Sequence, residues 1–393
     1  MTATFVALAV ATLVFYIASG IVLTAAPLFG GQRLGLSKAA VGVAIAIFSV
    51  AALAMRPVVG WSTDRFGRRQ ALLVGGGLFL VGILGHLIAN DVLTFLVMRC
   101  ILGAGEAFWL VAAMSAAADL APAGRRGESL SFVSLTLYVG LAVGPWLAEG
   151  ILAATGSFAL VWMATAAVAA VSVVLAWFVP ETAPSRAASG PEVVRGPRPR
   201  PRLIHPAGLF PGLVILLGLA GMAYYLSFLP LYVRSIGLDS AGLPLAEYGL
   251  IVVALRVVGA RLPDRLGVVT LSGAALLASA IGLGIIAAVQ TVGGLLVGTG
   301  IFAFGVAFIM PALLSLTVAR VPPDERGTVV GTATLFIDVS FGIAPVMLGA
   351  VAEIAGYPLG FLVAGAVSAL GCLLLVVGSR SSRPGPIGAG AGA

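Results

Sequence analysis

Long runs of apolar residues, separated by short polar turns, dominate this chain of 393 residues. The runs are apolar throughout and do not alternate with period two, which favours helices over strands. A helix needs about 20 apolar residues to cross the hydrocarbon core of a bilayer, and twelve runs approach that length. They lie at residues 5–28, 41–60, 71–89, 92–118, 129–154, 158–179, 207–232, 244–262, 268–289, 292–318, 327–351 and 357–378. The pattern therefore predicts an all-α membrane protein with twelve transmembrane helices.

The composition agrees with a membrane protein, because 60% of the residues are hydrophobic and only 9% are charged. Soluble proteins carry about 25% charged residues. The net charge of +7 does not indicate a nucleic-acid partner, since the basic residues are sorted by side. Sixteen of the 22 Lys and Arg residues fall on one predicted side, and only Arg33, Lys38 and Arg234 fall on the other. The positive-inside rule then predicts a multi-pass protein of the cell membrane with both termini in the cytoplasm.

The charged hairpin at residues 60–69 recurs 200 residues later in the chain. The matched pairs include Arg56 and Arg256, Asp64 and Asp264, Arg65 and Arg265, Gly67 and Gly267, and Pro145 and Pro345. One offset held over so many positions indicates an internal repeat, as in transporters built from two related halves. The predicted domains are residues 1–180 and 207–380, each with six helices.

Residues 181–206 interrupt the apolar rhythm with closely spaced proline and arginine, a composition that predicts an extended or flexible cytoplasmic linker. Its arginines are expected to lie against anionic lipid headgroups. The Gly- and Ala-rich segment 381–393 is predicted to be a disordered tail.

The eighth apolar run is shorter than its counterpart in the first half. Gly42 and Arg56 are 14 residues apart, whereas Gly249 and Arg256 are seven apart. At 1.5 Å per residue this shortens the span by about two turns. Two explanations stay open: the helix starts early, using Leu243 and Pro244, or it is less tilted in the bilayer.

Two hairpins carry a resemblance to the major facilitator superfamily. The segment Gly60-x-x-x-Asp64-Arg65-x-Gly67-Arg68-Arg69 resembles the superfamily's signature loop between spans two and three, and residues 260–267 resemble its degenerate second copy. The resemblance extends over essentially the whole chain. It implies two pseudo-symmetric six-helix bundles that work by alternating access.

Two further motifs lie within predicted spans. Arg99-x-x-x-Gly103-x-Gly105 resembles the arginine motif of span four. Gly140-x-x-x-Gly144-Pro145-x-x-x-x-Gly150 resembles the span-five motif associated with antiporters and exporters, although it lacks the paired glycines that often end it. Within the superfamily the chain therefore resembles drug/proton-antiporter-like efflux members.

The resemblance implies that both hairpins form a conformational latch that closes the two halves on the cytoplasmic face. Asp64 is expected to accept hydrogen bonds from the N-terminus of a neighbouring helix. A topology anchor alone is the other interpretation. The predicted latch residues are Gly60, Asp64, Arg65, Gly67, Arg68, Arg69, Asp264, Arg265 and Gly267.

Gly140, Gly144 and Pro145 give span five a flat, bendable surface that another helix can approach closely. The alternatives are ordinary small-residue packing and a hinge that seals the two halves.

Ionisable residues inside spans are costly and therefore informative. Glu106 lies in the middle of span four and Asp338 in the middle of span eleven, and the equivalent positions in the other half hold Val306 and Tyr138. We expect Glu106 and Asp338 to be the carboxylates that load and release protons. Arg99, seven residues before Glu106 on the same helical face, is expected to bias it; a permanent Arg99–Glu106 salt bridge is the structural alternative.

A cavity for an apolar ligand is expected to use the aromatic residues Phe108, Trp109, Tyr138 and Tyr224, with Glu149 as a further cavity or water-exposed group. Each aromatic residue has ordinary packing as its alternative. Two cysteines, Cys100 and Cys372, both within apolar runs, support neither a disulfide framework nor a metal site.

The sequence carries no ATP-binding or nucleophile-elbow motif, so we expect no cofactor and no enzymatic activity. The favoured function is proton-coupled export of a small apolar or amphipathic molecule, such as a drug, toxin or metabolite, by a monomer in the lipid bilayer. One alternative is a proton-coupled importer of a polar metabolite. Another is a non-transporting membrane scaffold or receptor, for which acidic residues in the middle of the membrane would be unnecessary.

Overall fold

A computed structural model describes residues 2–121, 126–182, 204–259, 262–318, 321 and 326–381. Most of the predicted linker (183–203) and tail (382–393) lie outside the described residues, as do Ala260 and Arg261 at the start of the second hairpin.

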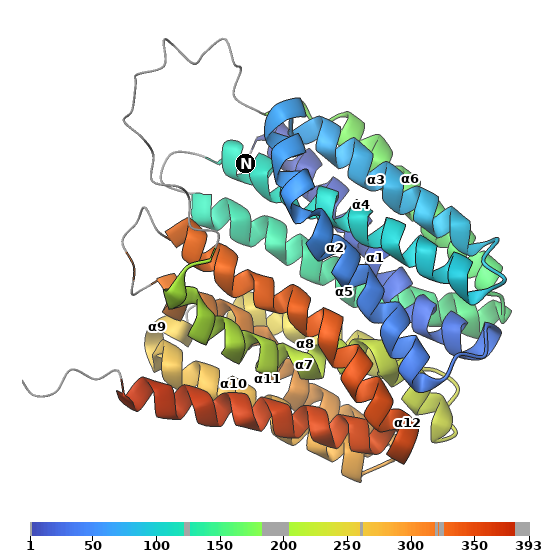
Figure 1. Cartoon of the computed structure of the whole chain (residues 1–393), viewed down its shortest axis with the longest axis vertical. Coiled ribbons are helices and arrows are strands. Elements are labelled where there is room, and N and C mark those ends of the chain that lie inside the picture. Colours follow the sequence, from blue (N-terminus) through green and yellow to red (C-terminus); the bar gives the residue numbers. More distant parts are fainter. Residues whose placement is uncertain are drawn as a thin grey trace, which may run out of the picture.

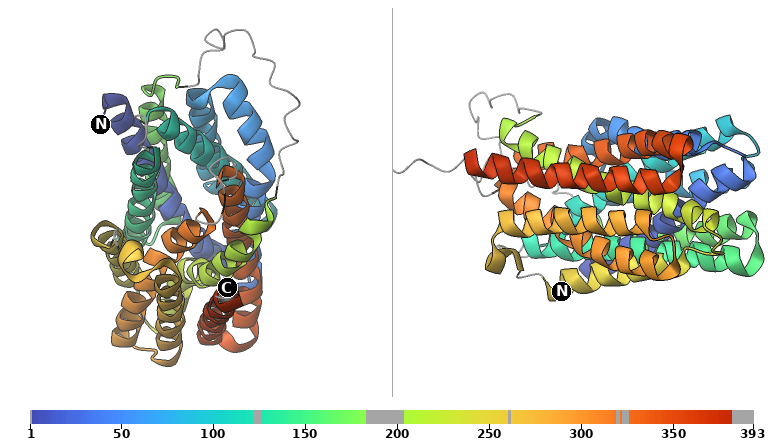
Figure 2. Two further views of the ribbon diagram at one scale, coloured as in Figure 1. Left: turned by 90° about the vertical axis from the view of Figure 1, so that its left-hand side faces the viewer. Right: turned by 90° about the horizontal axis from the view of Figure 1, so that it is seen from below.

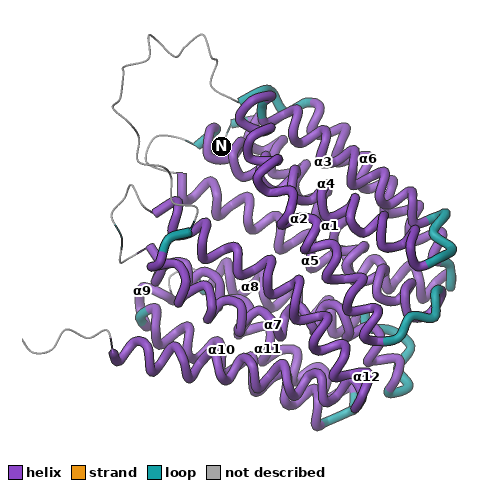
Figure 3. Tube along the Cα trace, viewed as in Figure 1, coloured by secondary structure: helices purple, strands orange, loops and turns teal. Residues whose placement is uncertain are grey.

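Helices account for nearly all of the described chain (Figure 3). In order they are α1 (Ala3–Leu28), which continues as a short π-helix η1 (Phe29–Arg33), α2 (Lys38–Phe66), α3 (Arg68–His86), α4 (Val92–Asp119), α5 (Arg126–Thr155), α6 (Phe158–Trp177), α7 (Pro206–Ser235), α8 (Gly242–Val258), α9 (Leu262–Leu266), α10 (Val268–Ala288), α11 (Val292–Val318) and α12 (Arg326–Ser381). Within α12 the backbone leaves the helical conformation at Ala355 and Gly356. Among the described residues, ten helical stretches are long and apolar enough to cross a membrane.

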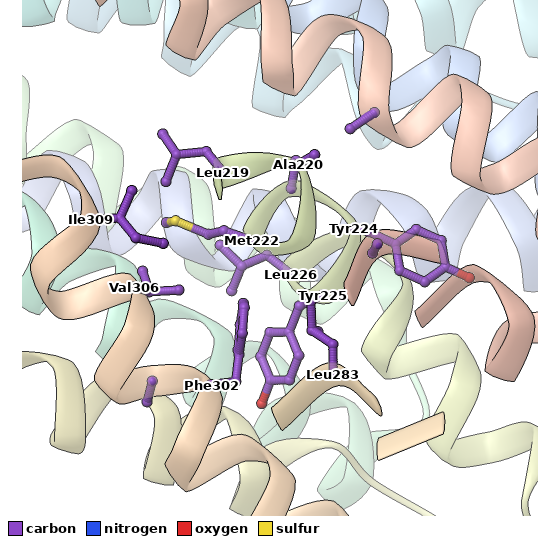
Figure 4. Close-up of a cluster of buried hydrophobic side chains, with 14 of the residues drawn as sticks. Leu219, Ala220, Met222, Tyr224, Tyr225, Leu226, Leu283, Phe302, Val306 and Ile309 are labelled. Carbon is purple, nitrogen blue, oxygen red and sulfur yellow. The ribbon is translucent and has the colours of Figure 1, made fainter. Parts of the chain in front are cut away.

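The helices run roughly side by side, with α1–α6 on one side of the molecule and α7–α12 on the other (Figures 1 and 2). Each group has its own cluster of buried side chains. In the first, Phe15 of α1 stacks on Trp109 of α4 with ring centroids 4.3 Å apart. In the second, Tyr225 of α7 packs on Phe302 of α11 (Figure 4). The chain thus folds around two hydrophobic centres.

The groups meet mainly through two pairs of helices, α2 against α12 and α5 against α8, and α1 also contacts α7. Both crossings use glycine. A Cβ atom on Gly42 of α2 would collide with the carbonyl oxygen of Pro345 in α12, and one on Gly249 of α8 would collide with Ala142 of α5. Small residues let helix backbones approach closely where lipid gives no hydrophobic drive for association. We call these pairs the α2–α12 contact and the α5–α8 contact.

The short eighth run begins early. Helix α8 starts at Gly242 and so includes Leu243 and Pro244, as the first of the two sequence-based explanations requires. It ends at Val258 after 17 residues, and α9 follows as a separate short helix, whereas α2 continues without a break for 29 residues to Phe66. Gly259 and Pro263 stand at this break, and neither residue type favours a continuous helix.

Candidate functional site

An ion pair connects the two groups of helices at the α2–α12 contact. Arg56 Nη2 of α2 lies 2.6 Å from Asp338 Oδ2 of α12, and the two side chains are 32% and 19% exposed. Among the described residues Asp338 Oδ2 makes no hydrogen bond, so its contact with Arg56 is ionic. The sequence singled out Asp338 but gave Arg56 no role beyond its place in the repeat. The feature of the sequence that could have identified Arg56 is that a basic residue occurs within an apolar run at both 56 and 256.

The second predicted carboxylate, Glu106, lies in the first group of helices. It is partly buried on α4, and Ser19 Oγ of α1 donates a long hydrogen bond of 3.5 Å to its Oε1. The two predicted acids come from different groups of helices, Glu106 from α4 and Asp338 from α12.

Tyr16 of α1 is a buried polar residue that was missed in the sequence, where it looks like one residue of an apolar run. Its hydroxyl is buried and has no hydrogen-bond partner among the described residues. A neutral hydroxyl in this position can donate to a carboxylate or accept from a protonated carboxyl group.

Arg99 is oriented differently from the predicted Arg99–Glu106 salt bridge. Its Nε donates to the carbonyl oxygen of Ala44 in α2 at 3.1 Å, and its guanidinium lies 4.7 Å from the ring centroid of Phe48. Within the part of the chain that the structure describes, no ion pair joins it to Glu106. Seven residues of helix separate the two by roughly 10 Å along the axis, beyond ion-pair reach. Arg99 holds α4 against α2 and acts on Glu106 only through its charge.

At the α5–α8 contact Arg256 faces an aromatic ring, whereas its counterpart in the repeat, Arg56, faces a carboxylate. The guanidinium of Arg256 in α8 lies 3.5 Å from the ring centroid of Tyr138 in α5. Positions 256 and 138 are the repeat counterparts of 56 and 338. Tyr138, predicted to line a cavity, therefore belongs to the junction of the two groups of helices.

The first hairpin binds within its own group of helices. Arg68 is bonded to Asp119 at the end of α4 (Nε to Oδ2, 2.9 Å) and to the carbonyl oxygen of Thr63 (3.1 Å). Asp64 is mostly exposed and contacts Arg68 one turn away at 3.3 Å. The structure therefore differs from the expectation that Asp64 accepts bonds from a helix N-terminus.

That place is taken by Glu181, just after α6. Its carboxylate accepts the backbone N–H groups of Arg68 (2.8 Å) and Arg69 (3.3 Å) at the start of α3, where the helix dipole favours a negative charge. Gly67 precedes α3 with φ +104, and a Cβ there would meet the same carboxylate. Glu181 was interpreted from the sequence only as the first residue of the linker.

The remaining latch residues surround this hairpin and its second copy. Gly60 has open space around it, and the guanidinium groups of Arg65 and Arg69 lie over Trp61 and Trp177 at 5.3 and 5.1 Å. In the second copy Gly267 precedes α10 with φ +76, and Arg265 is exposed. The side chain of Asp264 lies outside the described residues.

The glycines of α5 pack inside one group of helices. A Cβ on Gly140 would lie 2.6 Å from Cβ of Tyr16, and one on Gly144 would lie 2.6 Å from Cα of Gly20, both in α1. Pro145 lies beside Gly20 at this crossing. The geometry matches small-residue packing of α5 on α1, the simpler of the two interpretations.

Glu149 is fully buried and joins α5 to the other group of helices. It pairs with Arg234 of α7 through two bonds of 3.0 and 2.9 Å, and Ser240 Oγ donates a third at 3.1 Å. This three-bond contact differs from the predicted cavity or water-exposed position. At the α2–α12 contact a different acid, Glu353 of α12, makes a backbone contact: its Oε2 accepts the N–H of Lys38 at the start of α2 (2.6 Å).

Three predicted cavity residues belong to the hydrophobic clusters. Trp109 is 0% exposed and stacks on Phe15, and Phe108 lies in the same cluster. Tyr224 is 0% exposed, packs on Phe361, and donates to the carbonyl oxygen of Tyr357 at 3.2 Å (Figure 4). Their aromatic character serves core packing, because large rings bury the most area per residue.

The central residues can therefore handle protons and anions. Carboxylates near arginines can exchange protons, and guanidinium groups bind anions. The described ranges contain no group of three or more His, Cys, Asp or Glu side chains that could hold a metal ion.

Comparisons with known proteins give the family. The model of the Major Facilitator Superfamily matches residues 8–289 and 238–392. An uncharacterized MFS-type transporter of Salmonella typhimurium (strain LT2) is 30% identical over 372 residues, 92% of each chain. Among solved structures, the nucleoside transporter NupG superposes with a TM-score of 0.77 at 13% identity, covering 95% of this chain and 99% of that one. A D-xylose–proton symporter gives 0.77 at 17% identity, covering 94% and 96%.

Proposed function

This chain belongs to the Major Facilitator Superfamily of transporters, and from that premise we propose that it exports a small amphipathic molecule in exchange for protons. Proteins of this family move small molecules across membranes and are not enzymes. The proposal includes twelve spans in two six-helix bundles, in a cell membrane, with both termini in the cytoplasm. The ten candidate spans support this number once α8 is added and α12 is divided at Ala355 and Gly356.

The observation that carries the proposal is the Arg56–Asp338 ion pair between the two groups of helices. Alternating access requires contacts that hold two bundles together in one state and release them in the other. Protonation of Asp338 removes the charge that attracts Arg56, so proton binding weakens this contact. Glu106, the second acid within a span, acts with Asp338 in this proposal, so that two acids couple proton binding to movement.

The direction of transport rests on the span-five motif Gly140 to Gly150 and its resemblance to exporters. Uptake of a polar solute with protons is the second candidate. It is favoured by the charged centre around Arg56, Asp338 and Glu106 and by the likeness in fold to a D-xylose–proton symporter.

The test uses inverted membrane vesicles with an imposed pH gradient, an exporter-type substrate (ethidium) and an importer-type substrate (radiolabelled xylose). Export predicts gradient-driven accumulation of ethidium inside the vesicles. Glu106→Gln and Asp338→Asn should each lower this accumulation at least tenfold, while Asp239→Asn, an exposed acid between α7 and α8, should leave it unchanged. Full gradient-driven transport by both central variants would refute the assignment of the two acids. Gradient-driven movement of xylose without movement of ethidium would favour uptake.

A further inference from the structure

Arg256 at the α5–α8 contact has binding capacity that the protein itself does not use. Its Nε and Nη2 atoms are buried and have no hydrogen-bond partner among the residues that the structure describes. These two nitrogens form one edge of the guanidinium, the edge that binds a carboxylate or phosphate with two parallel hydrogen bonds. Leaving buried donors of a charged group unpaired is costly.

The internal repeat shows what is absent at this place. Arg56, the counterpart of Arg256, meets the carboxylate of Asp338, the counterpart of Tyr138. In the second contact the carboxylate is replaced by a phenol ring, which attracts the cation through its face and accepts no hydrogen bond there. The positive charge is kept in both contacts, but the negative charge is present in only one of them.

Aromatic side chains lie near Arg256. Tyr138 lies against the guanidinium, and Tyr248, eight residues before Arg256 on α8 and next to Gly249 at the helix crossing, is buried. Tyr248 in turn stacks on Phe302 and packs against Tyr225 with the rings tilted. A cation bordered by aromatic faces suits an anionic group attached to a flat apolar body.

We propose that Arg256 binds the anionic group of the transported molecule, so that the substrate is an amphipathic organic anion whose carboxylate or phosphate occupies the place that Asp338 holds in the other contact. The proposal rests on the proposed transport function and specifies its substrate class. The ligand supplies the missing negative charge between α5 and α8. Binding of the anion then strengthens the α5–α8 contact, just as loss of the proton from Asp338 strengthens the α2–α12 contact, because each event places a negative charge beside an arginine.

The experiment measures binding to the purified full-length chain in detergent by equilibrium dialysis. The radiolabelled probes are benzoate, 2-naphthoate and 1-pyrenebutyrate, each paired with its neutral amide, and 2-naphthyl phosphate as the phosphate arm. At least one anion should bind more tightly than its amide. Arg256→Gln should weaken that anion by about 10- to 100-fold, the usual range for losing charge-assisted hydrogen bonds, and leave the amide unchanged. Arg256→Lys, which keeps the charge but not the paired edge, should recover only part of the affinity.

The matched control is Arg33→Gln, which removes an exposed arginine from η1. It should leave anion binding unchanged. A preference for 2-naphthyl phosphate over 2-naphthoate would identify phosphate as the recognised group, and the reverse would identify carboxylate.

Two results would overturn the anion site. One is that no anion binds the unmodified chain more tightly than its amide. The other is that Arg256→Gln weakens anion and amide equally, together with the melting temperature, because Arg256 then only supports Tyr138. Gradient-driven transport into the inverted vesicles, measured with ethidium and with the anion 1-pyrenebutyrate, separates the two proposals. If ethidium follows the gradient while the anions show no preference, the substrate class is wrong and proton coupling stands. If the anions bind through Arg256 while no probe follows the gradient, proton coupling is wrong and the anion site stands.

Discussion

The α2–α12 contact and the α5–α8 contact occupy equivalent places in the two repeats but use different chemistry. Both contain a glycine crossing and an arginine, at Gly42 and Arg56 in one and at Gly249 and Arg256 in the other. Gly42 faces the backbone of α12, and Gly249 faces Cβ and Cα of Ala142 in α5. The arginines meet a carboxylate in the first and an aromatic ring in the second. Close packing is the shared scaffold, and the charged groups are where the two contacts have diverged.

The difference continues at the far end of each contact. Near the α2–α12 contact, Glu353 accepts backbone N–H groups at the start of α2 and is exposed. Near the α5–α8 contact, Glu149 is fully buried and forms two bonds with Arg234. The α2–α12 contact thus has an ion pair at Arg56 and a helix cap at Glu353. The α5–α8 contact has no ion pair at Arg256 but a buried one at Glu149. We infer that each contact keeps one strong charged link, at opposite ends.

The largest expected effect tests the shared scaffold. Gly42→Val places side-chain atoms against the carbonyl of Pro345, and backbone on the partner helix cannot move aside as a side chain can. We expect a loss of about 3 kcal/mol in stability, measured as thermal unfolding in detergent, and a similar loss for Gly249→Val. Gly77→Ala in α3, where a Cβ meets nothing within 4 Å, is the control and should keep the original stability. Equal stability of Gly42→Val and Gly77→Ala would show that the crossing is looser than described.

The next effect compares the two ends. Glu149→Gln leaves Arg234 without its counter-charge, and we expect a loss of about 2 kcal/mol, below the range for fully buried pairs because Arg234 is 21% exposed. Glu353→Gln can still accept the backbone N–H groups through its amide oxygen, so it should lose less than about 1 kcal/mol. Both values come from thermal unfolding of the same preparation. Equal losses would contradict the assignment of the strong link to Glu149.

A smaller effect converts one contact into the other. Tyr138→Asp gives Arg256 an internal carboxylate, as Arg56 already has in Asp338. This carboxylate competes with a bound anion, so we expect affinity for 2-naphthoate to fall about tenfold, equivalent to about 1.4 kcal/mol. Tyr138→Phe keeps the ring and should retain the affinity. Unchanged binding in Tyr138→Asp would separate Arg256 from anion recognition.

The smallest effect compares the two hairpins. Gly67 and Gly267 both have positive φ, so replacing either with alanine costs about 1 kcal/mol in backbone strain. At Gly67 the new Cβ also displaces the carboxylate of Glu181, whereas at Gly267 it meets nothing within 4 Å. Gly67→Ala should therefore be less stable than Gly267→Ala by about 1 kcal/mol, the value of a lost helix cap. Thermal unfolding in the Glu181→Gln background checks whether the displaced carboxylate is the cause. There, Gly67→Ala should lower the stability by less than it does in the original chain.

Much of this protein could be predicted from its sequence because the bilayer leaves few choices. Apolar runs of span length must be helices, and ten of the described stretches have the length and composition to cross a membrane. The repeat at an offset of 200 residues identified equivalent positions, among them Arg56 and Arg256. Because charge is costly in lipid, Glu106 and Asp338 stand out within their apolar runs from the sequence alone.

The partners of those residues were decided only by tertiary structure. Asp338 meets Arg56, 282 positions away, and Glu149 meets Arg234 from another helix. Arg99, expected near Glu106, turns to Ala44 because a helix fixes the spacing along its axis but not which neighbour lies beside each face. Helix formation depends on local composition and on the solvent, so the sequence determines it. Which side chains meet depends on how the helices cross, and that is set by backbone contacts such as those at Gly42 and Gly249.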